Sequence, residues 1–573
     1  MKIKLPFFFL LEIILCTPVY ATIPIDYPGY YTSRKINKTL DTLLLSKRHS
    51  YPAEFARTAD FLTKWQVTNP ADTNFGGMIE AEAGALANII QTDNTLEAIW
   101  VWARYGQLTG DTAKFSTNIR NAKIYCDRYP PWEEEGAVEY DYYRVHNSAW
   151  ALTAAEVYSE TYGDSSYYGF ADSCADYIMS HPLNIYHPSY KYINSFVTGW
   201  AAGNLYQYGA LRNNNNWMDS AATYGERLMY WITLSTQLRL SEETWAMSSG
   251  TIVWGICNST FREDTIRGKA WIDTNGSYVD TFQVWRDCGD GYNWDNAWNV
   301  AYCNAHYAMY EISRDTKYKN KHKFLTDVLL SYDTDFDGGI TSTTQDPDTE
   351  DMCWVSSYLA KMGLNNIFET LPDTDAGIIK FVSPQNQVKY NIGDSLDIIL
   401  EVSNFGLKPL NGVKIKITGC YEDSAFTDLN FTETKNIIFT KKCLSQTPDT
   451  LTLTAVTTYP GDNNLSNDTT TITFFVDVPA VSEIPNEYKT NMKITPNPFV
   501  SYATISYQLP AKTKTSLKIY DIGGRLVKTF INEEKQAGSY NFNLDAKNLP
   551  PGIYFAKLIC GNRSFTQKLT LLK

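Results

Sequence analysis

The 573-residue sequence predicts a multidomain protein, with an all-α (α/α)6 toroid followed by two β-sandwich domains. Two observations lead to this fold class. Tryptophans recur at intervals of about 50 residues through the first part of the chain, in stretches with helical spacing of apolar residues. After residue 375, short alternating apolar runs are separated by Pro, Gly and Asn, as in strands joined by turns.

The N-terminal stretch "MKIKLPFFFLLEIILCTPVYA" predicts a cleaved secretion signal over residues 1–21. Lys2 and Lys4 precede an apolar run, and Val19 and Ala21 fit a cleavage site that requires small residues. The run is too short to span a membrane, and no other stretch approaches ~20 continuous apolar residues. We therefore expect a mature chain without a transmembrane segment.

Residues 22–375 contain the helical repeat. We expect each tryptophan to open the first helix of a hairpin, and the second helix to follow turns such as "TGD" (109–111) and "YGD" (162–164). The tryptophans are Trp100, Trp150, Trp200, Trp254, Trp298 and Trp354. An unpaired helix at 52–67 precedes the first hairpin. In the sixth hairpin, the first helix has no second helix after it. Pairing these two would close the ring, whereas an open array would leave an apolar face uncovered at each end.

Two similar stretches follow second helices at opposite ends of this region: "DTNFGGM" (72–78) and "DTDFDGGI" (333–340). They predict equivalent positions of the repeat, in which paired glycines turn the chain sharply after a helix. In a toroid all such loops emerge at one end. We expect that end to gather the starts of the first helices, whose polar residues are read as N-caps: Asp93, Asn94, His146, Asn147, Thr198, Ser249, Asp295, Asn296, Glu350 and Asp351.

The same loops hold clustered acids and aromatic residues, which point to a sugar site. A glycoside hydrolase needs two carboxyl groups about 5 to 9.5 Å apart. The candidate carboxyls are Asp93, Glu139, Asp141, Asp287, Asp290 and Asp295. The candidate substrate-binding residues are Trp132, Tyr142, Arg144, Trp285 and Trp294.

A polysaccharide lyase is the first alternative, because it needs a Tyr or His base and a cation that neutralises a uronate carboxylate. The stretch "YDYYRVHN" supplies Tyr142, Tyr143, Arg144 and His146. The formal net charge of −13 argues against nucleic acid as a partner. An acidic mouth of the toroid would also repel a polyuronate substrate. We therefore favour hydrolysis of a neutral glycan. A non-catalytic surface protein that binds a glycan or a protein is the second alternative.

Asp333, Asp335 and Asp337, followed by Gly338 and Ile340, match the first positions of an EF-hand-like calcium loop. The twelfth position should be acidic but is a threonine, so a wider loop would have to supply Asp346, Asp348 or Glu350. The sequence thus leaves two readings open: a structural Ca²⁺ site or a solvated acidic turn. Apart from this ion we expect no cofactor, since the cysteines lack the CxxC spacing of a zinc site.

Residues 492–573 contain "PNPF" (496–499), "LKIYDIGGRLVKT" (517–529), "AGSYNFNLD" (537–545) and "PGIYFAKL" (551–558). This segment resembles the C-terminal sorting domain of the type IX (Por) secretion system. The resemblance implies a bacterial protein that passes through the outer membrane and is then released or attached at the cell surface. The secretion machinery is accordingly an expected partner.

Residues 380–478, joined to the C-terminal domain by a polar linker at 479–491, read as a separate β-sandwich. The phrases "VSNFGLKPLNGVKIKI" and "YPGDNNLSNDTTTITF" resemble the Ig-like adhesion modules of surface proteins. The helical region resembles the six-hairpin glycosidases and lyases in plan only, because no catalytic motif matches residue by residue. That resemblance implies a catalytic centre at the loop-rich end of the toroid.

Overall fold

The computed structural model describes most of the chain. The described residues are 49–83, 86–133, 141–187, 191–234, 243–281, 295–341, 351–443, 447–462, 464–477, 492–509, 512–561 and 563–572. The expected signal peptide lies outside them. The chain folds into two compact units, one built mainly from residues up to Phe474 and the other mainly from the residues after it. Within the described ranges, no helix is both long and apolar enough to cross a membrane.

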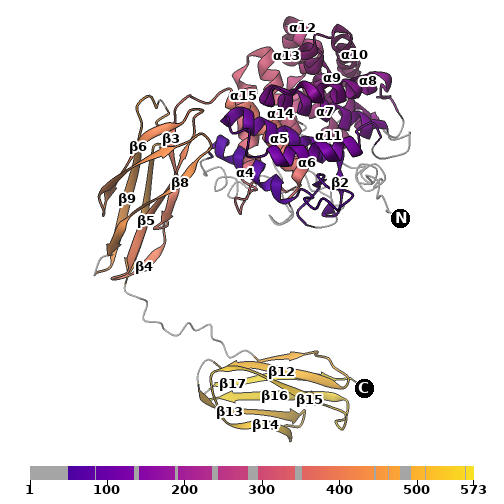
Figure 1. Cartoon of the computed structure of the whole chain (residues 1–573). Helices are drawn as coiled ribbons and strands as arrows, with labels where there is room; N and C mark the ends of the chain where they lie inside the picture. The colour runs from indigo at the N-terminus through magenta and orange to yellow at the C-terminus, as the bar shows by residue number, and fades with distance from the viewer. Residues whose placement is uncertain are drawn as a thin grey trace. The chain divides into compact units, whose positions relative to one another are not determined.

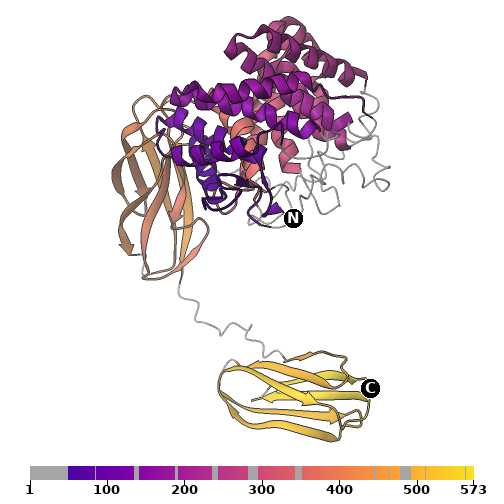
Figure 2. The same cartoon turned by 45° about the vertical axis from the view of Figure 1, so that its right-hand side comes forward.

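Inner helices form a closed ring in the first unit (Figures 1 and 2). Each packs against the next inner helix along the chain, and the last packs against the first. They are α5 (Thr92–Thr109), α7 (Asp141–Tyr162), α9 (Lys191–Arg212), α11 (Glu243–Asn258), α14 (Asp295–Ser313) and a sixth made of α16 (Cys353–Tyr358), η7 (Leu359–Leu364) and α17 (Asn365–Phe368). The predicted (α/α)6 toroid is confirmed.

Outer helices cover this ring, each joined to an inner helix as a hairpin. They are α4 (Tyr51–Lys64), α6 (Ser116–Arg128), α8 (Tyr168–Ser180) after the short η4 (Ser165–Tyr167), α10 (Asn215–Leu234), α12 (Thr260–Glu263) with α13 (Thr265–Thr281), and α15 (Thr316–Leu330). Helix α4 packs on α5 and on the sixth inner helix. The first helix therefore closes the ring with the last one, as predicted.

Burial distinguishes the two layers. Helix α5 buries nearly every residue between Thr92 and Gly106. Helix α6 buries one stripe only: Ile119, Ala122, Tyr125 and Cys126. A helix that is surrounded on all sides must be apolar all round, whereas a surface helix needs a single apolar stripe. This difference explains why the inner helices carry the tryptophans.

The tryptophans meet at one level inside the ring. The ring centroids of Trp150 and Trp200 are 4.7 Å apart, and those of Trp200 and Trp254 are 4.9 Å apart. In the sixth helix Tyr358 takes the corresponding place, 5.3 Å from Trp150, and Trp354 packs against Tyr358. The regular spacing of the tryptophans in the sequence thus corresponds to one layer of aromatic rings inside the toroid.

The predicted starts of the second, third and fourth inner helices are wrong. Helix α7 begins at Asp141 and α9 begins at Lys191, so His146, Asn147 and Thr198 lie inside these helices. The same holds for Ser249 inside α11. These residues cannot cap helix N-termini, because a cap precedes the first helical residue. The reason for the error is that the tryptophans mark the interior layer of the ring and not the ends of the helices.

The two glycine-paired loops are equivalent, as predicted. The backbone N–H of Met78 donates to Thr95 Oγ1 at 3.0 Å, and that of Ile340 donates to Ser356 Oγ at 2.9 Å. Thr95 and Ser356 each lie in the first turns of an inner helix, so the two bonds are copies of one contact. Each loop thus ties its chain segment to the inner helix that follows.

Both loops also pass close over an outer helix. A Cβ added to Gly76 would lie 1.8 Å from the carbonyl oxygen of Asn121 in α6. One added to Gly338 would lie 2.4 Å from the carbonyl carbon of Arg57 in α4. Both glycines have positive φ angles, of 93° and 94°. The position therefore requires glycine for two reasons, space and conformation.

The first and last loops bond to each other where the ring closes. The backbone N–H of Glu82 donates to the carbonyl of Asp351 at 2.8 Å, and that of Cys353 donates to the carbonyl of Glu80 at 2.9 Å. The short strands β1 (Met78–Ile79) and β2 (Ile90–Gln91) pair in the same region. Backbone hydrogen bonds thus join the two ends of the helical region.

Two sheets follow the helices, and they have the order β3-β5-β8 and β4-β10-β9-β6-β7. Their strands are β3 (Ala376–Ser383), β4 (Lys389–Asn391), β5 (Ser395–Asn404), β6 (Leu410–Gly419), β7 (Asp423–Leu429), β8 (Thr434–Cys443), β9 (Asp449–Thr458) and β10 (Thr469–Asp477). Alternate residues of β5 and β6 are buried, the pattern of two sheets packed face to face. The Ig-like character of this region stays a prediction.

The second unit contains a sandwich of its own, drawn in yellow in Figures 1 and 2. Its sheets have the order β11-β12-β15 and β14-β13-β16-β17. The strands are β11 (Met492–Thr495), β12 (Tyr502–Leu509), β13 (Thr513–Asp521), β14 (Leu526–Lys535), β15 (Gly538–Asp545), β16 (Gly552–Cys560) and β17 (Arg563–Leu571). Both sheets contribute to one apolar core, which contains Ile505 and Leu558. The predicted second β-sandwich is confirmed.

Candidate active site

Two carboxyl groups lie on one face of α5, near the end of the ring at which the inner helices begin. Asp93 and Glu97 are four residues apart, so their Cβ atoms are about 6 Å from each other. Asp93 is 6% exposed and Glu97 is 1% exposed. Sequence reasoning proposed Asp93 and missed Glu97, although the four-residue spacing on a helix was the available signal.

His146 of α7 and Tyr358 of α16 complete the group. His146 Nδ1 is 3.9 Å from Asp93 Oδ2, and His146 Nε2 is hydrogen-bonded to Tyr358 Oη at 3.2 Å. Phe196 of α9 stacks on the imidazole, with 6.0 Å between the ring centroids. Three neighbouring inner helices and the sixth one, which closes the ring, therefore converge on this site.

Burial sets the protonation states in this group. It lowers the pKa of His146 to about 4, against a weaker opposing effect of Asn147. The imidazole is therefore neutral at physiological pH. Burial and the nearby carboxyls of Glu97 and Asp93 raise the pKa of Tyr358 well above its usual range, so its hydroxyl stays protonated.

Glu97 is the most unusual member of the group. Burial raises its pKa well above the usual range, and the neighbouring acids Asp93 and Glu80 add to the rise. Its Oε2 atom has no hydrogen-bond partner among the described residues. A buried polar atom without a partner is costly in a folded protein and is often kept for function. The site thus holds a carboxyl whose surroundings favour its protonated form, beside a second carboxyl.

The other described candidates lie in different contacts. Tyr177 of the outer helix α8 donates to Asp141 and also contacts Arg144. Trp132 packs on Phe170, also in α8, with 5.5 Å between the ring centroids.

Tyr142 and Tyr143 are buried against each other, with 4.5 Å between their ring centroids. The structure therefore brings together Asp93 and His146 from the predicted set. It places Asp141, Arg144 and Trp132 against the outer layer.

Several predicted residues lie outside the described part of the chain. They are Glu139, Trp285, Asp287, Asp290 and Trp294. Asp295 is the first residue of α14, as its predicted position at a helix start requires, but its side chain is not described. Their roles stay predictions.

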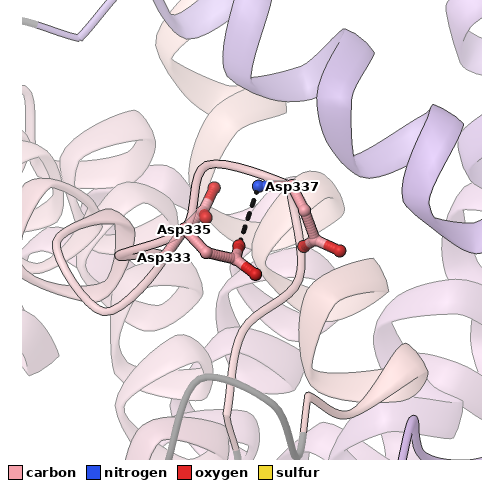
Figure 3. A group of neighbouring side chains, drawn as sticks. All are labelled: Asp333, Asp335 and Asp337. Carbon is pink, nitrogen blue, oxygen red and sulfur yellow. Dashed lines mark hydrogen bonds between the residues drawn. The ribbon is translucent and has the colours of Figure 1, made fainter.

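The acidic loop holds three carboxylates in a cluster that would suit a cation (Figure 3). One oxygen each from Asp333, Asp335 and Asp337 can be chosen so that all lie within 4.8 Å of one another. The N–H of Gly338 donates to Asp333 Oδ2 at 3.2 Å, and that of Asp337 donates to Asp335 Oδ1 at 3.1 Å. Hard oxygen ligands of this kind are the ones that Ca²⁺ prefers.

Two further groups border this loop. Lys64 Nζ forms an ion pair with Asp337 Oδ2 at 2.8 Å. Burial raises the pKa of Glu82, and the charges of Asp337 and Asp335 raise it further, which shows that a fourth carboxyl from the first loop lies near. The expected twelfth-position ligands, residues 346–350, lie outside the described residues. Calcium binding stays a prediction, with Glu82 as a ligand candidate that the sequence pattern did not reveal.

Comparison with known proteins identifies the C-terminal segment. Residues 493–571 match the family described as the secretion system C-terminal sorting domain. No curated protein matches the sequence.

Solved structures resemble the helical region at low identity. The Lin0763 protein of Listeria innocua is 12% identical, with 56% of this chain and 97% of that chain covered and a TM-score of 0.41. An inactive variant of an α-1,6-mannanase from Salegentibacter sp. HEL1_6, in complex with α-1,6-mannotetrose, is 11% identical, with 55% and 98% covered and a TM-score of 0.40. A GH76 α-mannanase from Bacteroides thetaiotaomicron is 11% identical, with 57% and 97% covered and a TM-score of 0.39.

Similarities at this level leave the activity of this chain open. The sorting domain, in contrast, indicates secretion or attachment at the bacterial cell surface and an interaction with the Por secretion machinery. The chain therefore carries a secretion system C-terminal sorting domain behind a helical toroid and a first β-sandwich.

Proposed function

We propose that the protein is a secreted or surface-attached carbohydrate-active enzyme, a glycoside hydrolase that acts on a neutral glycan at the end of the ring where the inner helices begin. The observation that carries this proposal is the buried carboxyl of Glu97, whose Oε2 atom has no hydrogen-bond partner among the described residues, beside Asp93 and near His146. The sorting domain supports export to a location where extracellular glycans are met. Cleavage of an N-terminal signal after Ala21 belongs to the same proposal.

The chemistry assigns a different role to each carboxyl. Burial raises the pKa of Glu97, which favours its protonated form, so Glu97 would protonate the leaving glycosidic oxygen as the general acid. Asp93 would act as the base that activates water, or as the nucleophile, because a spacing of one helical turn falls near the separations that such pairs use. His146 and Tyr358 would hold Asp93 and the sugar hydroxyls in place. Asp295 keeps its place as a further candidate carboxyl.

A lyase is the second candidate, and one observation favours it. A neutral His146 hydrogen-bonded to the Tyr358 hydroxyl is a pair that could abstract a proton beside a uronate carboxylate. However, the carboxyls of Glu80 and Asp93 lie near Glu97, and their negative charge would repel a polyuronate. Hydrolysis is therefore the preferred reaction. A non-catalytic glycan-binding role is the remaining alternative.

The test is turnover of a panel of neutral and uronate-containing glycans by the full chain, with product analysis. New reducing ends without unsaturated products support the hydrolase. The ultraviolet absorbance of unsaturated uronates would instead support the lyase. Glycan binding without any turnover would leave only the binding protein.

We also propose that the acidic loop of Asp333, Asp335 and Asp337 binds a structural calcium ion. The three clustered oxygens and the nearby Glu82 carboxyl support this part of the proposal. The ion would stabilise the last loop of the ring, and no catalytic step depends on it.

A further inference from the structure

A polar cavity of about 270 Å³ lies at the end of the ring opposite Asp93 and Glu97. Each inner helix contributes to its lining, for example through Arg104, Glu160, Gln207, Asn258, Tyr307 and Lys361. In α5 and α7 these residues follow the tryptophan of the helix, whereas Asp93 and His146 precede it. The tryptophan layer therefore lies between the candidate active site and this cavity.

Lys361 lies in a stretch of unusual backbone. It belongs to η7, a turn of π-helix within the sixth inner helix, and such turns occur often at functional sites. Its ammonium group donates to Thr153 Oγ1 at 3.0 Å and lies 4.7 Å from the ring centroid of Trp100. Thr153 and Trp100 also line the cavity. The ammonium group of Lys361 therefore lies at the cavity wall with few partners.

Glu156 faces the same space. Its charge and that of Lys361 influence each other, yet no ion pair joins these two described side chains. A single hydroxyl group can accept a hydrogen bond from an ammonium and donate one to a carboxylate. A sugar hydroxyl placed between Lys361 and Glu156 would therefore have a donor on one side and an acceptor on the other.

The walls are rich in carboxamides, which both donate and accept hydrogen bonds. They are Gln107, Gln207, Asn258, Asn304, Asn365 and Asn366. Some of their mutual bonds are long: 3.2 Å from Gln207 Nε2 to Asn258 Oδ1, and 3.4 Å from Asn366 Nδ2 to Asn304 Oδ1. Long bonds of this kind are weak, so a ligand hydroxyl can replace them at little cost.

The charges of the cavity disfavour an anion. Arg104, Arg262 and Lys361 face four carboxyl side chains, and Arg262 already pairs with Glu311 at 2.7 Å. The C-terminal ends of the inner helices add partial negative charge. Aromatic faces of Trp100 and Trp254 complete the lining and suit the apolar side of a sugar ring.

We propose that this cavity binds one neutral monosaccharide, whose hydroxyls bridge Lys361 and Glu156 and bond to the surrounding carboxamides. The volume lies just below the range of about 300–1,000 Å³ of pockets for drug-sized ligands, so it suits a single sugar ring and not an oligosaccharide. This site is separate from the proposed hydrolytic site and does not depend on it.

The experiment is calorimetry or saturation-transfer NMR on the full chain with mannose, glucose and galactose, with glucuronate and glucosamine as charged controls. At least one neutral sugar should bind, and Glu156→Gln and Gln207→Ala should weaken this binding about tenfold or more, the effect of losing roughly 1.4 kcal/mol. Asp93→Asn, at the other end of the ring, should leave it unchanged. Gln207→Ala removes a partly exposed side chain from the cavity wall, so it keeps the test valid if Glu156→Gln fails to fold.

Three results would overturn the proposal. One is the absence of binding by every neutral sugar in the panel. Another is tighter binding of glucuronate or glucosamine than of any neutral sugar. The third is loss of binding in Asp93→Asn but not in Glu156→Gln or Gln207→Ala, which would assign the sugar to the candidate active site.

Discussion

The two ends of the helical ring are built from the same inner helices but carry opposite kinds of polar chemistry. At the end where the helices begin, Asp93, Glu97 and Glu80 gather beside the neutral imidazole of His146. At the other end, acids are matched by cations, as in the pair Arg262–Glu311. Charge matching fits reversible binding, whereas a buried carboxyl with a raised pKa fits proton transfer.

The largest expected effect tests the first end. Glu97→Gln should lower kcat on the glycan substrate by about a hundredfold or more, because the general acid is lost. Folding should be retained, since glutamine has nearly the same shape as the buried glutamic acid that it replaces. Glu226→Gln is the matched control, because Glu226 lies on outer helix α10 in an exposed pair with Arg267. Equal activity of Glu97→Gln and the control would remove Glu97 from the mechanism.

The pH dependence of stability gives a second test of the same end. The folded-state pKa of His146 is lowered to about 4 from an ordinary value near 6.5, so the unfolded chain binds its proton first as pH falls. Stability should therefore decrease between about pH 6.5 and pH 4, by at most about 3 kcal/mol from this residue. His146→Gln should reduce this loss of stability at acidic pH, measured as the free energy of unfolding in denaturant titrations.

Glu97 should act with the opposite sign. Its pKa is raised in the folded state, so the unfolded chain ionises first and stability is lost as pH rises from about 4.3. Glu97→Gln should remove that loss while leaving the acid limb of His146 intact. Identical pH profiles for the wild type and both variants would contradict the protonation states described above.

The acidic loop at 333–340 offers a third test, which concerns calcium binding. The equivalent loop at 72–78 serves as the control. Calcium at a hundredfold excess over Kd should increase the free energy of unfolding of the wild type by about 3 kcal/mol. This increase should appear as a higher melting temperature, and a chelator should reverse it. Asp337→Asn should abolish the response, whereas Asp72→Asn in the equivalent first loop should leave it unchanged. Lys64→Met should strengthen the response, because Lys64 now holds Asp337. A wild-type melting curve that is insensitive to calcium would contradict the calcium site.

The smallest effect is expected at the charge-matched end. Lys361→Met should destabilise the fold by about 1–2 kcal/mol, because Glu156 then lacks its nearest cation in a half-buried setting. The double variant Lys361→Met/Glu156→Gln should recover most of this loss. Additive losses measured by urea unfolding would show that the two side chains do not interact.

The sequence predicted the ring well because its repeat is strong. Tryptophan spacing and the paired glycines of the two loops are local signals. The tryptophans recur because they form one layer inside the ring. The glycines recur because Gly76 and Gly338 each pass close over an outer helix. Helix starts were mispredicted because the same tryptophans were read as helix openings.

The site was harder to predict because it is non-local. His146 meets Tyr358 across 212 residues of chain, and no periodicity reports such a contact. Asp141 fits the sequence criteria for a catalytic acid as well as Asp93 does, and only the packing of Tyr177 separates the two.

The hydrogen bonds between the first and last loops have a consequence for how the protein is made. Glu82 and Asp351 are far apart in the chain, so the ring cannot close until almost the whole helical region has been synthesised. Contacts of such high sequence separation slow folding, because the entropy of a long loop must be lost before the contact forms. The C-terminal sorting domain is made later still. A chain truncated before the sixth inner helix would therefore be an open arc with exposed apolar edges, a substrate for proteases and not a smaller enzyme.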